Sequence, residues 1–83
     1  MDTARDNEVE GALGVGIICV DQSICEIQHN TVVGTKVDGN QNPSRQGVAI
    51  EANFYAEAHV HHNTVVASPG GVQAFDNSTV QTP

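Results

Sequence analysis

The chain has 83 residues, of which 39% are hydrophobic and only 4% aromatic, and its formal net charge is −7. A chain of this length forms one small domain at most, and such a domain buries only about 60–65% of its unfolded surface. The absence of a basic patch excludes nucleic acid and anionic membrane surfaces as expected partners. No apolar run approaches the length needed to span a bilayer, so we expect no membrane insertion.

Residues 1–14 open the chain with a polar and then glycine-punctuated segment. Four acidic residues and little apolar content occupy residues 1–10. We therefore interpret this segment as a frayed N-terminal end or the remains of a preceding turn.

Three short strands that each begin with glycine are predicted at residues 16–21, 47–53 and 71–77. In each, the glycine is followed by an apolar residue, any residue, and another small or apolar residue. Alternation of this kind places every second side chain inward. The predicted inward set is Ile17, Cys19, Val48, Ile50, Val72 and Ala74.

A pentapeptide, His29-Asn30-Thr31-Val32-Val33, recurs unchanged at residues 62–66. Residues 25–28 and 58–61 precede the two copies with alternating small or apolar and polar side chains, and residues 78–81 repeat this pattern more weakly. The Thr-Val-Val of each copy predicts one more short strand. Each repeating unit therefore contains three strands.

The spacing between units is uneven. The glycine-led strands are 31 and 24 residues apart, and the longer interval contains the polar, turn-rich residues 37–46, which we interpret as a protruding loop. Without that loop the unit is about 22–24 residues long, a period typical of solenoid repeats. An antiparallel meander remains an alternative. Stacked coils explain the repetition better, because equivalent residues then lie about 4.8 Å apart.

These units resemble the repeats of right-handed parallel β-helix proteins, the pectin-lyase-like superfamily. Residues 16–19 with 27–32, and residues 47–50 with 60–65, carry the resemblance, which extends from about residue 15 to 82. It implies an all-β, right-handed parallel β-helix of about two and a half rungs over residues 15–83. It also implies an extracellular or cell-surface location.

Solenoids generally need three or more repeats and polar terminal caps. We therefore expect this chain to be part of a longer protein, whose remaining rungs would stack on these.

The two cysteines, Cys19 and Cys25, lack the spacing of a zinc or redox motif. We favour two small, buried, apolar side chains over a disulfide.

The candidate site is an outward patch formed by Glu26, Gln28, His59 and His61. Alternation places Glu26 next to His59 and Gln28 next to His61 on adjacent rungs. His59, His61 and Glu26 could ligate a divalent transition metal, or the patch could supply an acid/base pair. The third interpretation is a solvated strand face with a favourable Glu–His contact.

The pentapeptide itself is interpreted as structural. Asn30 and Asn63 would stack at one corner, where each side-chain amide can bond to its neighbour and to the turn backbone. His29 and His62 would stack beside them.

The resemblance implies a scaffold segment of an extracellular, carbohydrate-associated protein, and the residues themselves show no catalytic centre and suggest no cofactor other than a divalent metal. A polysaccharide would be its partner. One alternative is part of a polysaccharide lyase, hydrolase or epimerase with its active rungs elsewhere; Lys36 and Arg45 are the only cations a lyase site could recruit here. Another alternative is an adhesin or tailspike-like binding protein, which predicts outward aromatic residues that we do not expect in this chain.

Overall fold

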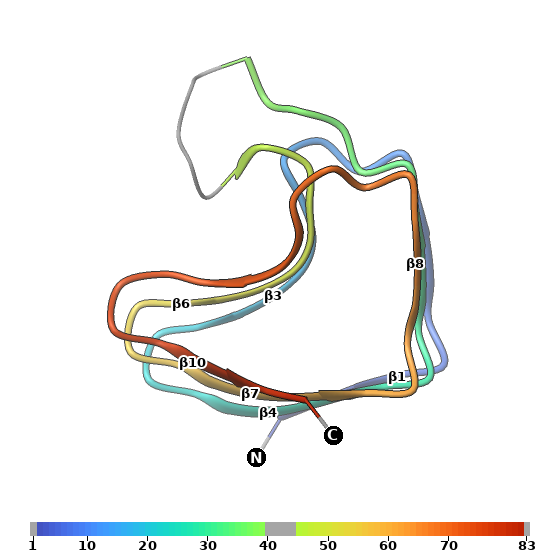
Figure 1. Cartoon of the computed structure of the whole chain (residues 1–83). Helices are drawn as coiled ribbons and strands as arrows, with labels where there is room; N and C mark the ends of the chain where they lie inside the picture. Colours follow the sequence, from blue (N-terminus) through green and yellow to red (C-terminus); the bar gives the residue numbers. More distant parts are fainter. Residues whose placement is uncertain (1, 40–44, 83) are drawn as a thin grey trace.

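The computed structural model describes residues 2–39 and 45–82. Its ten strands are β1 (Asp2–Arg5), β2 (Glu8–Glu10), β3 (Val15–Val20), β4 (Ile24–Gln28), β5 (Thr31–Val33), β6 (Val48–Asn53), β7 (Glu57–His61), β8 (Thr64–Val66), β9 (Gly71–Ala74) and β10 (Thr79–Gln81). They form three parallel sheets, in the orders β1-β4-β7-β10, β2-β5-β8 and β3-β6-β9. Successive strands along the chain enter different sheets, so the chain winds in stacked coils (Figure 1). The predicted parallel β-helix is confirmed.

The repeated pentapeptide lies at the same corner of two successive coils. Thr31, Val32 and Val33 pair with Thr64, Val65 and Val66 in a parallel register. The repetition in sequence therefore reflects a turn that recurs in every coil.

The expectation of a frayed N-terminal end is wrong. β1 pairs with β4 and β2 pairs with β5, so residues 2–10 belong to the first coil. Ala4 and Val9 pack against the core, while Glu8 and Glu10 on either side of Val9 are exposed. The acidic composition of this segment hid the alternation of its side chains.

Gly14, rather than Gly16, is the counterpart of Gly47. The register joins Val15 with Val48, Ile17 with Ile50 and Cys19 with Ala52. Gly14 and Gly47 both have a positive φ, of 86° and 75°, which favours glycine. The predicted alignment was shifted by two residues, which leaves the inward face unchanged because the side-chain period of a strand is two.

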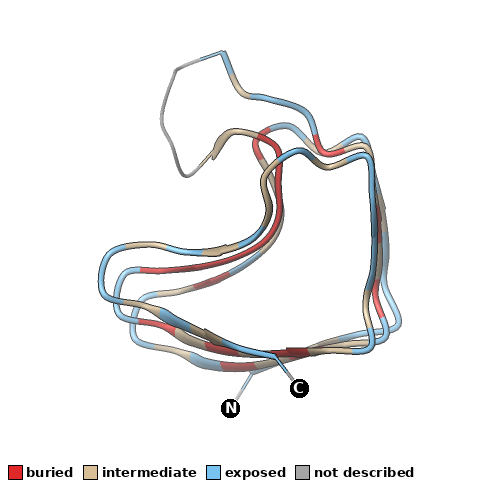
Figure 2. Cartoon of the chain, in the orientation of Figure 1, coloured by how far each residue is buried: buried red, intermediate tan, exposed pale blue. Residues whose placement is uncertain are grey.

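Three of the six predicted inward residues are buried, and those of the last coil are exposed. Cys19, Val48 and Ile50 are buried and Ile17 is half-buried, whereas Val72 and Ala74 are exposed. β9 is the edge of its sheet, so no described strand covers these two side chains. Burial is most complete along β6, the middle strand of that sheet (Figure 2).

The expected loop at residues 37–46 falls partly on residues 40–44, which lie outside the described part of the chain. At its base, Val37 forms an antiparallel bridge with Gln46. Arg45 forms an ion pair with Asp38, in which Arg45 Nε lies 2.8 Å from Asp38 Oδ2. The described ends of this segment project away from the coil (Figure 1).

Cys19 and Cys25 form a disulfide, so the prediction of two unlinked cysteines is wrong. Cys19 ends the inward row of β3 and Cys25 begins that of β4, and the intervening turn brings the two Cα atoms within 6.1 Å. Both are buried. The next coil has Ala52 and Ala58 at the same positions, so the bridge replaces an alanine pair in the core.

Candidate functional site

The outward face of β4 and β7 carries the patch predicted from the sequence. Cys25 and Ile27 of β4, and Ala58 and Val60 of β7, are buried, and the residues between them point outward. The parallel register places Glu26 opposite His59 and Gln28 opposite His61, as the alternation predicted.

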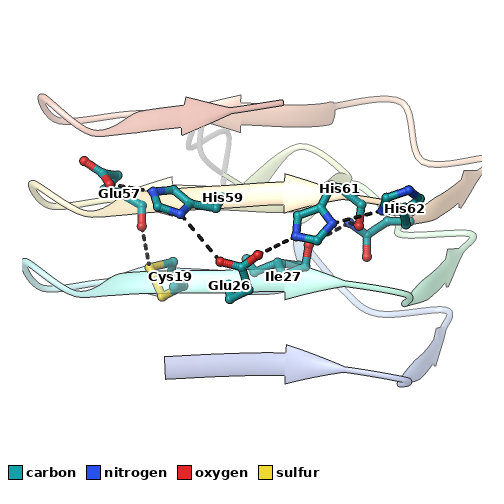
Figure 3. A network of polar contacts seen from close by, with 9 residues as sticks. Cys19, Glu26, Ile27, Glu57, His59, His61 and His62 are labelled. Atoms are coloured by element: carbon teal, nitrogen blue, oxygen red, sulfur yellow. Dashed lines mark hydrogen bonds and ion pairs between the residues drawn. A yellow bond between two sulfur atoms is a disulfide. The ribbon is translucent and has the colours of Figure 1, made fainter. Parts of the chain in front are cut away.

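A chain of polar contacts crosses this face (Figure 3). Glu57 Oε2 lies 2.6 Å from His59 Nε2, and His59 Nδ1 lies 3.5 Å from Glu26 Oε2. The other oxygen of Glu26 accepts a hydrogen bond from His61 Nε2. His61 Nδ1 in turn lies 3.0 Å from Nδ1 of His62. Two carboxylates and three imidazoles from adjacent coils therefore form one network, which we call the Glu–His network.

The electrostatics of the Glu–His network favour a charged histidine beside charged carboxylates. The hydrogen bond to Glu57, together with the negative charges of Glu57 and Glu26, raises the pKa of His59. The hydrogen bond from His61, helped by the charges of both histidines, lowers the pKa of Glu26. Both ring nitrogens of His59 face carboxylate oxygens, an arrangement that favours the protonated imidazolium.

Sequence reasoning missed Glu57 and joined Gln28 too closely to the site. Glu57 lies just before the strand predicted at residues 58–61, but it precedes His59 by two residues and continues the outward row of β7. Gln28 lies on the same face, but among the described residues no hydrogen bond joins it to the network. His62, expected only at the corner, joins through His61.

The geometry does not support the predicted metal site of His59, His61 and Glu26. Both ring nitrogens of His59 and of His61 already contact carboxylates or another imidazole. Within residues 2–39 and 45–82, no group of three or more His, Cys, Asp or Glu side chains is arranged to hold a metal ion. For the acid/base alternative, His59 or His61 would have to exchange one of these contacts for a contact with a substrate.

A column of asparagines supports the adjacent corner. Asn30 donates from its backbone N and its Nδ2 to Oδ1 of Asn63, at 2.9 and 3.0 Å. Asn7, one coil earlier, makes the same pair of bonds to Oδ1 of Asn30, both at 3.0 Å. The remaining side-chain hydrogens bond the backbone, from Asn30 to Ala4 O and from Asn63 to Ile27 O. Asn7 was missed because its segment, residues 6–10, shares only Asn7 and Val9 with the pentapeptide.

His29 and His62 stack beside this column. Their ring centroids are 5.2 Å apart and their planes differ by 9°. Both have a left-handed backbone, with φ of 55° and 56°, as does Asp6 with φ of 57° in the first coil. The corner therefore uses one left-handed residue immediately before each asparagine.

Glu51 is the one buried carboxylate that the sequence analysis did not single out as a site. It is 1% exposed on β6, and its Oε2 accepts a hydrogen bond from Asn53 Nδ2 at 2.9 Å. Its Oε1 has no hydrogen-bond partner among residues 2–39 and 45–82. Burial raises the pKa of Glu51, opposed by the Asn53 hydrogen bond and the charge of Arg45. Arg45 is one of the two cations that a lyase site could recruit in this chain. It is already ion-paired with Asp38.

The expectation of no outward aromatic residues is wrong. Phe54 and Tyr55 are 49% and 63% exposed at the turn between β6 and β7. The pattern of strands predicted a turn there, but not that two rings would form it.

Comparisons with known proteins agree with the fold. The family described as a right handed beta helix region matches residues 2–82. No curated protein and no solved structure matches the chain. Among the described residues, no helix is long and apolar enough to cross a membrane. With nearly the whole chain matched and three parallel sheets stacked in coils, the chain belongs to the right-handed β-helix family.

Proposed function

We propose that the chain is a structural β-helix segment of an exported protein that associates with carbohydrate outside the reducing cytosol. The buried Cys19–Cys25 disulfide carries the first part of this proposal. Disulfides persist in oxidising compartments and are rare in cytosolic proteins. Burial inside the coil protects the bridge from exchange with external thiols.

A structural role is supported by how fully the polar groups of the patch bind one another. The Glu–His network joins β4 to β7, and the asparagine column joins three successive corners. Such contacts lock one coil on the next, which is the task of a scaffold. An enzymatic role for the parent protein would then depend on residues outside this network.

Carbohydrate association is the finer part of the proposal. An open depression lies beside the Glu–His network and is lined by His59, Val60, His61, Gln81 and Thr82. Polar side chains around an exposed apolar floor suit a sugar ring, whose hydroxyl groups need hydrogen-bond partners and whose C–H face is apolar.

Thiol trapping tests the export proposal. Cells that produce the protein naturally are fractionated in the presence of an alkylating reagent, and Cys19 and Cys25 are examined by mass spectrometry in each fraction. We expect the protein outside the cytosol, with both cysteines bridged and unalkylated. Protein confined to the cytosol with both thiols alkylated would refute export.

Binding to a soluble neutral polysaccharide, followed by calorimetry, tests the carbohydrate proposal. The double variant His59→Ala/His61→Ala should lose binding, whereas His29→Ala, which alters an exposed imidazole outside both the depression and the Glu–His network, should retain it. Equal heats for wild type and both variants would remove this surface as the binding site.

A further inference from the structure

The turn from one sheet to the next is built in the same way in every coil. Two consecutive residues with positive φ form it: Asp21 and Gln22, then Phe54 and Tyr55, then Asp76 and Asn77. Hydrogen bonds align the three turns, from Gln22 N to Phe54 O and from Tyr55 N to Asp76 O, each 3.0 Å long. We call the middle one the Phe-Tyr turn. All three turns lie at the same narrow end of the coil (Figure 1).

The residues of the Phe-Tyr turn are unsuited to this backbone. Asp and Asn tolerate the left-handed region because their short polar side chains can bond locally, whereas bulky residues are genuine outliers there. Phe54 and Tyr55 have φ of 56° and 61°. Residues held in sparsely populated conformations cluster at functional sites, so the outlier itself points to a role other than folding.

The two rings contribute little to the core. Phe54 and Tyr55 are about half and two thirds exposed, although the chain has only three large aromatic side chains in all. A chain with few rings would gain most by burying them. Here two of the three are exposed, on consecutive residues of the turn between β6 and β7.

The surroundings of the Phe-Tyr turn are acidic. Asp21 and Asp76 bracket it in the coils on either side, and both are exposed. Neither carboxylate has an ion-pair partner in the described parts of the chain. The three basic residues, Arg5, Lys36 and Arg45, lie in β1 and at the base of the loop. The chain as a whole is also acidic, with a formal net charge of −7.

We propose that the Phe-Tyr turn is a docking site for a basic segment of a partner protein. Exposed aromatic faces attract guanidinium and ammonium groups, and the flanking carboxylates of Asp21 and Asp76 complement the same charge. Tyrosine and other aromatic anchors dominate the energetics of protein interfaces. Phe54 and Tyr55 line neither of the two depressions beside β7, which favours an extended partner segment over an enclosed small molecule. This inference does not depend on the proposed export or carbohydrate association.

The test uses a fluorescent peptide of six arginines as the probe, at about 0.15 M salt to limit general charge attraction. The variant Phe54→Asn/Tyr55→Asn removes both rings and places a residue that tolerates positive φ at each position. The control Glu8→Gln/Glu10→Gln removes two exposed acids from the first coil. We expect the ring variant to bind the peptide about tenfold more weakly, and the control less than twofold more weakly.

Two outcomes would overturn the proposal. A ring variant that binds the peptide no more weakly than the control does would mean that net charge, rather than the two rings, attracts the peptide. Binding of cellohexaose that depends on the two rings, without ring-dependent binding of the peptide, would make a neutral polysaccharide the ligand. If the Asn variant fails to give the wild-type circular dichroism spectrum, Phe54→Leu/Tyr55→Leu repeats the test with apolar side chains that lack the ring face.

Discussion

Asn30 and Asn63 occupy the same corner of adjacent coils, and two donors of Asn30 converge on the single side-chain oxygen of Asn63 at 2.9 and 3.0 Å. Asn30 is 1% exposed, so water cannot replace these bonds. The pair therefore couples the corner turn of one coil to that of the next. A repeated His-Asn pair at first suggests an active-site motif, but these bonds assign its asparagine to the turn.

Replacement of Asn30 by alanine tests this coupling. The substitution leaves the Asn63 oxygen with fewer donors and removes the bond to Ala4 O, so we expect a loss of about 2–4 kcal/mol in the free energy of unfolding. Urea unfolding measures it. Asn7→Ala is the matched control, because it removes one side-chain bond at the edge of the sheet stack and should cost less than half as much. Equal losses in the two variants would contradict the claim that the asparagine column stabilises the middle coil more than the first.

The disulfide gives a second prediction. Cys19→Ala/Cys25→Ala copies the alanine pair that the next coil has at these positions, so the variant should fold with the core intact. Because the bridge closes a loop across a sequence separation of only six residues, its removal should cost about 2 kcal/mol. Denaturation of the oxidised protein and of the variant provides the comparison. A variant as stable as the wild type would show that the bridge does not restrain the turn.

The Glu–His network predicts a dependence on pH whose sign follows from the two shifts. A raised pKa of His59 stabilises the fold fully below its ordinary value of 6.5, and this contribution is lost as the pH rises through the raised pKa. A lowered pKa of Glu26 stabilises the fold above its ordinary value of 4.5, and this contribution is lost as the pH falls through the lowered pKa. Both contributions are present together between pH 4.5 and 6.5.

Glu26→Gln should therefore lower the melting temperature most within that window and least under alkaline conditions. Thermal melts across the pH range measure the difference between variant and wild type. Glu8→Gln, an exposed acid on β2 without a histidine opposite, serves as the control and should give a difference that varies little. A Glu26→Gln difference that is the same at all pH values would remove the charged pair as the cause.

Glu51 predicts that the free energy of unfolding depends on pH with a sign opposite to that for Glu26. Burial raises its pKa, so ionisation costs stability, and the free energy of unfolding should fall as the pH rises above 4.5. Glu51→Gln keeps an oxygen to accept from Asn53 and cannot ionise, so it should flatten this fall. Chemical denaturation at several pH values tests the prediction, and an unchanged slope would contradict it.

The Phe-Tyr turn predicts a gain in stability from losing a ring. Tyr55 is 63% exposed and has φ of 61°, so Tyr55→Asn should relieve strain at little cost in packing and raise the free energy of unfolding by about 0.5–1 kcal/mol. The reciprocal change Asn77→Tyr, at the equivalent position of the next coil with φ of 58°, should lower it similarly. A loss of stability in Tyr55→Asn would mean that the ring is there to support the fold.

Much of the fold could be predicted because a stacked coil repeats its chemistry. The recurring pentapeptide and the alternation before it were sufficient to place β4, β5, β7 and β8, and to set Glu26 opposite His59. The first coil was missed because it shares only Asn7 and Val9 with the pentapeptide. In the sequence, Gly14 and Gly16 are equally good candidates for the counterpart of Gly47. The positive φ of Gly14, which Gly47 shares, decides between them.

The candidate site was less predictable, because its contacts depend on distances that alternation does not provide. Cys19 and Cys25 meet because the turn between their strands is tight, which the sequence spacing alone leaves open. Glu57 joins the Glu–His network because β7 begins one residue earlier than the predicted strand. The exposure of Phe54 and Tyr55 depends on the left-handed turn, whose other copies contain ordinary turn residues.

The central claim is that β4 and β7 are parallel neighbours in adjacent coils, with Cys25 beside Ala58 and Glu26 beside His59. Nuclear Overhauser contacts in the isotope-labelled chain test it most directly. The account predicts contacts between Hα and amide protons along these pairs in the order of a parallel register. Short Hα–Hα contacts between the two strands, which are typical of an antiparallel meander, would contradict it.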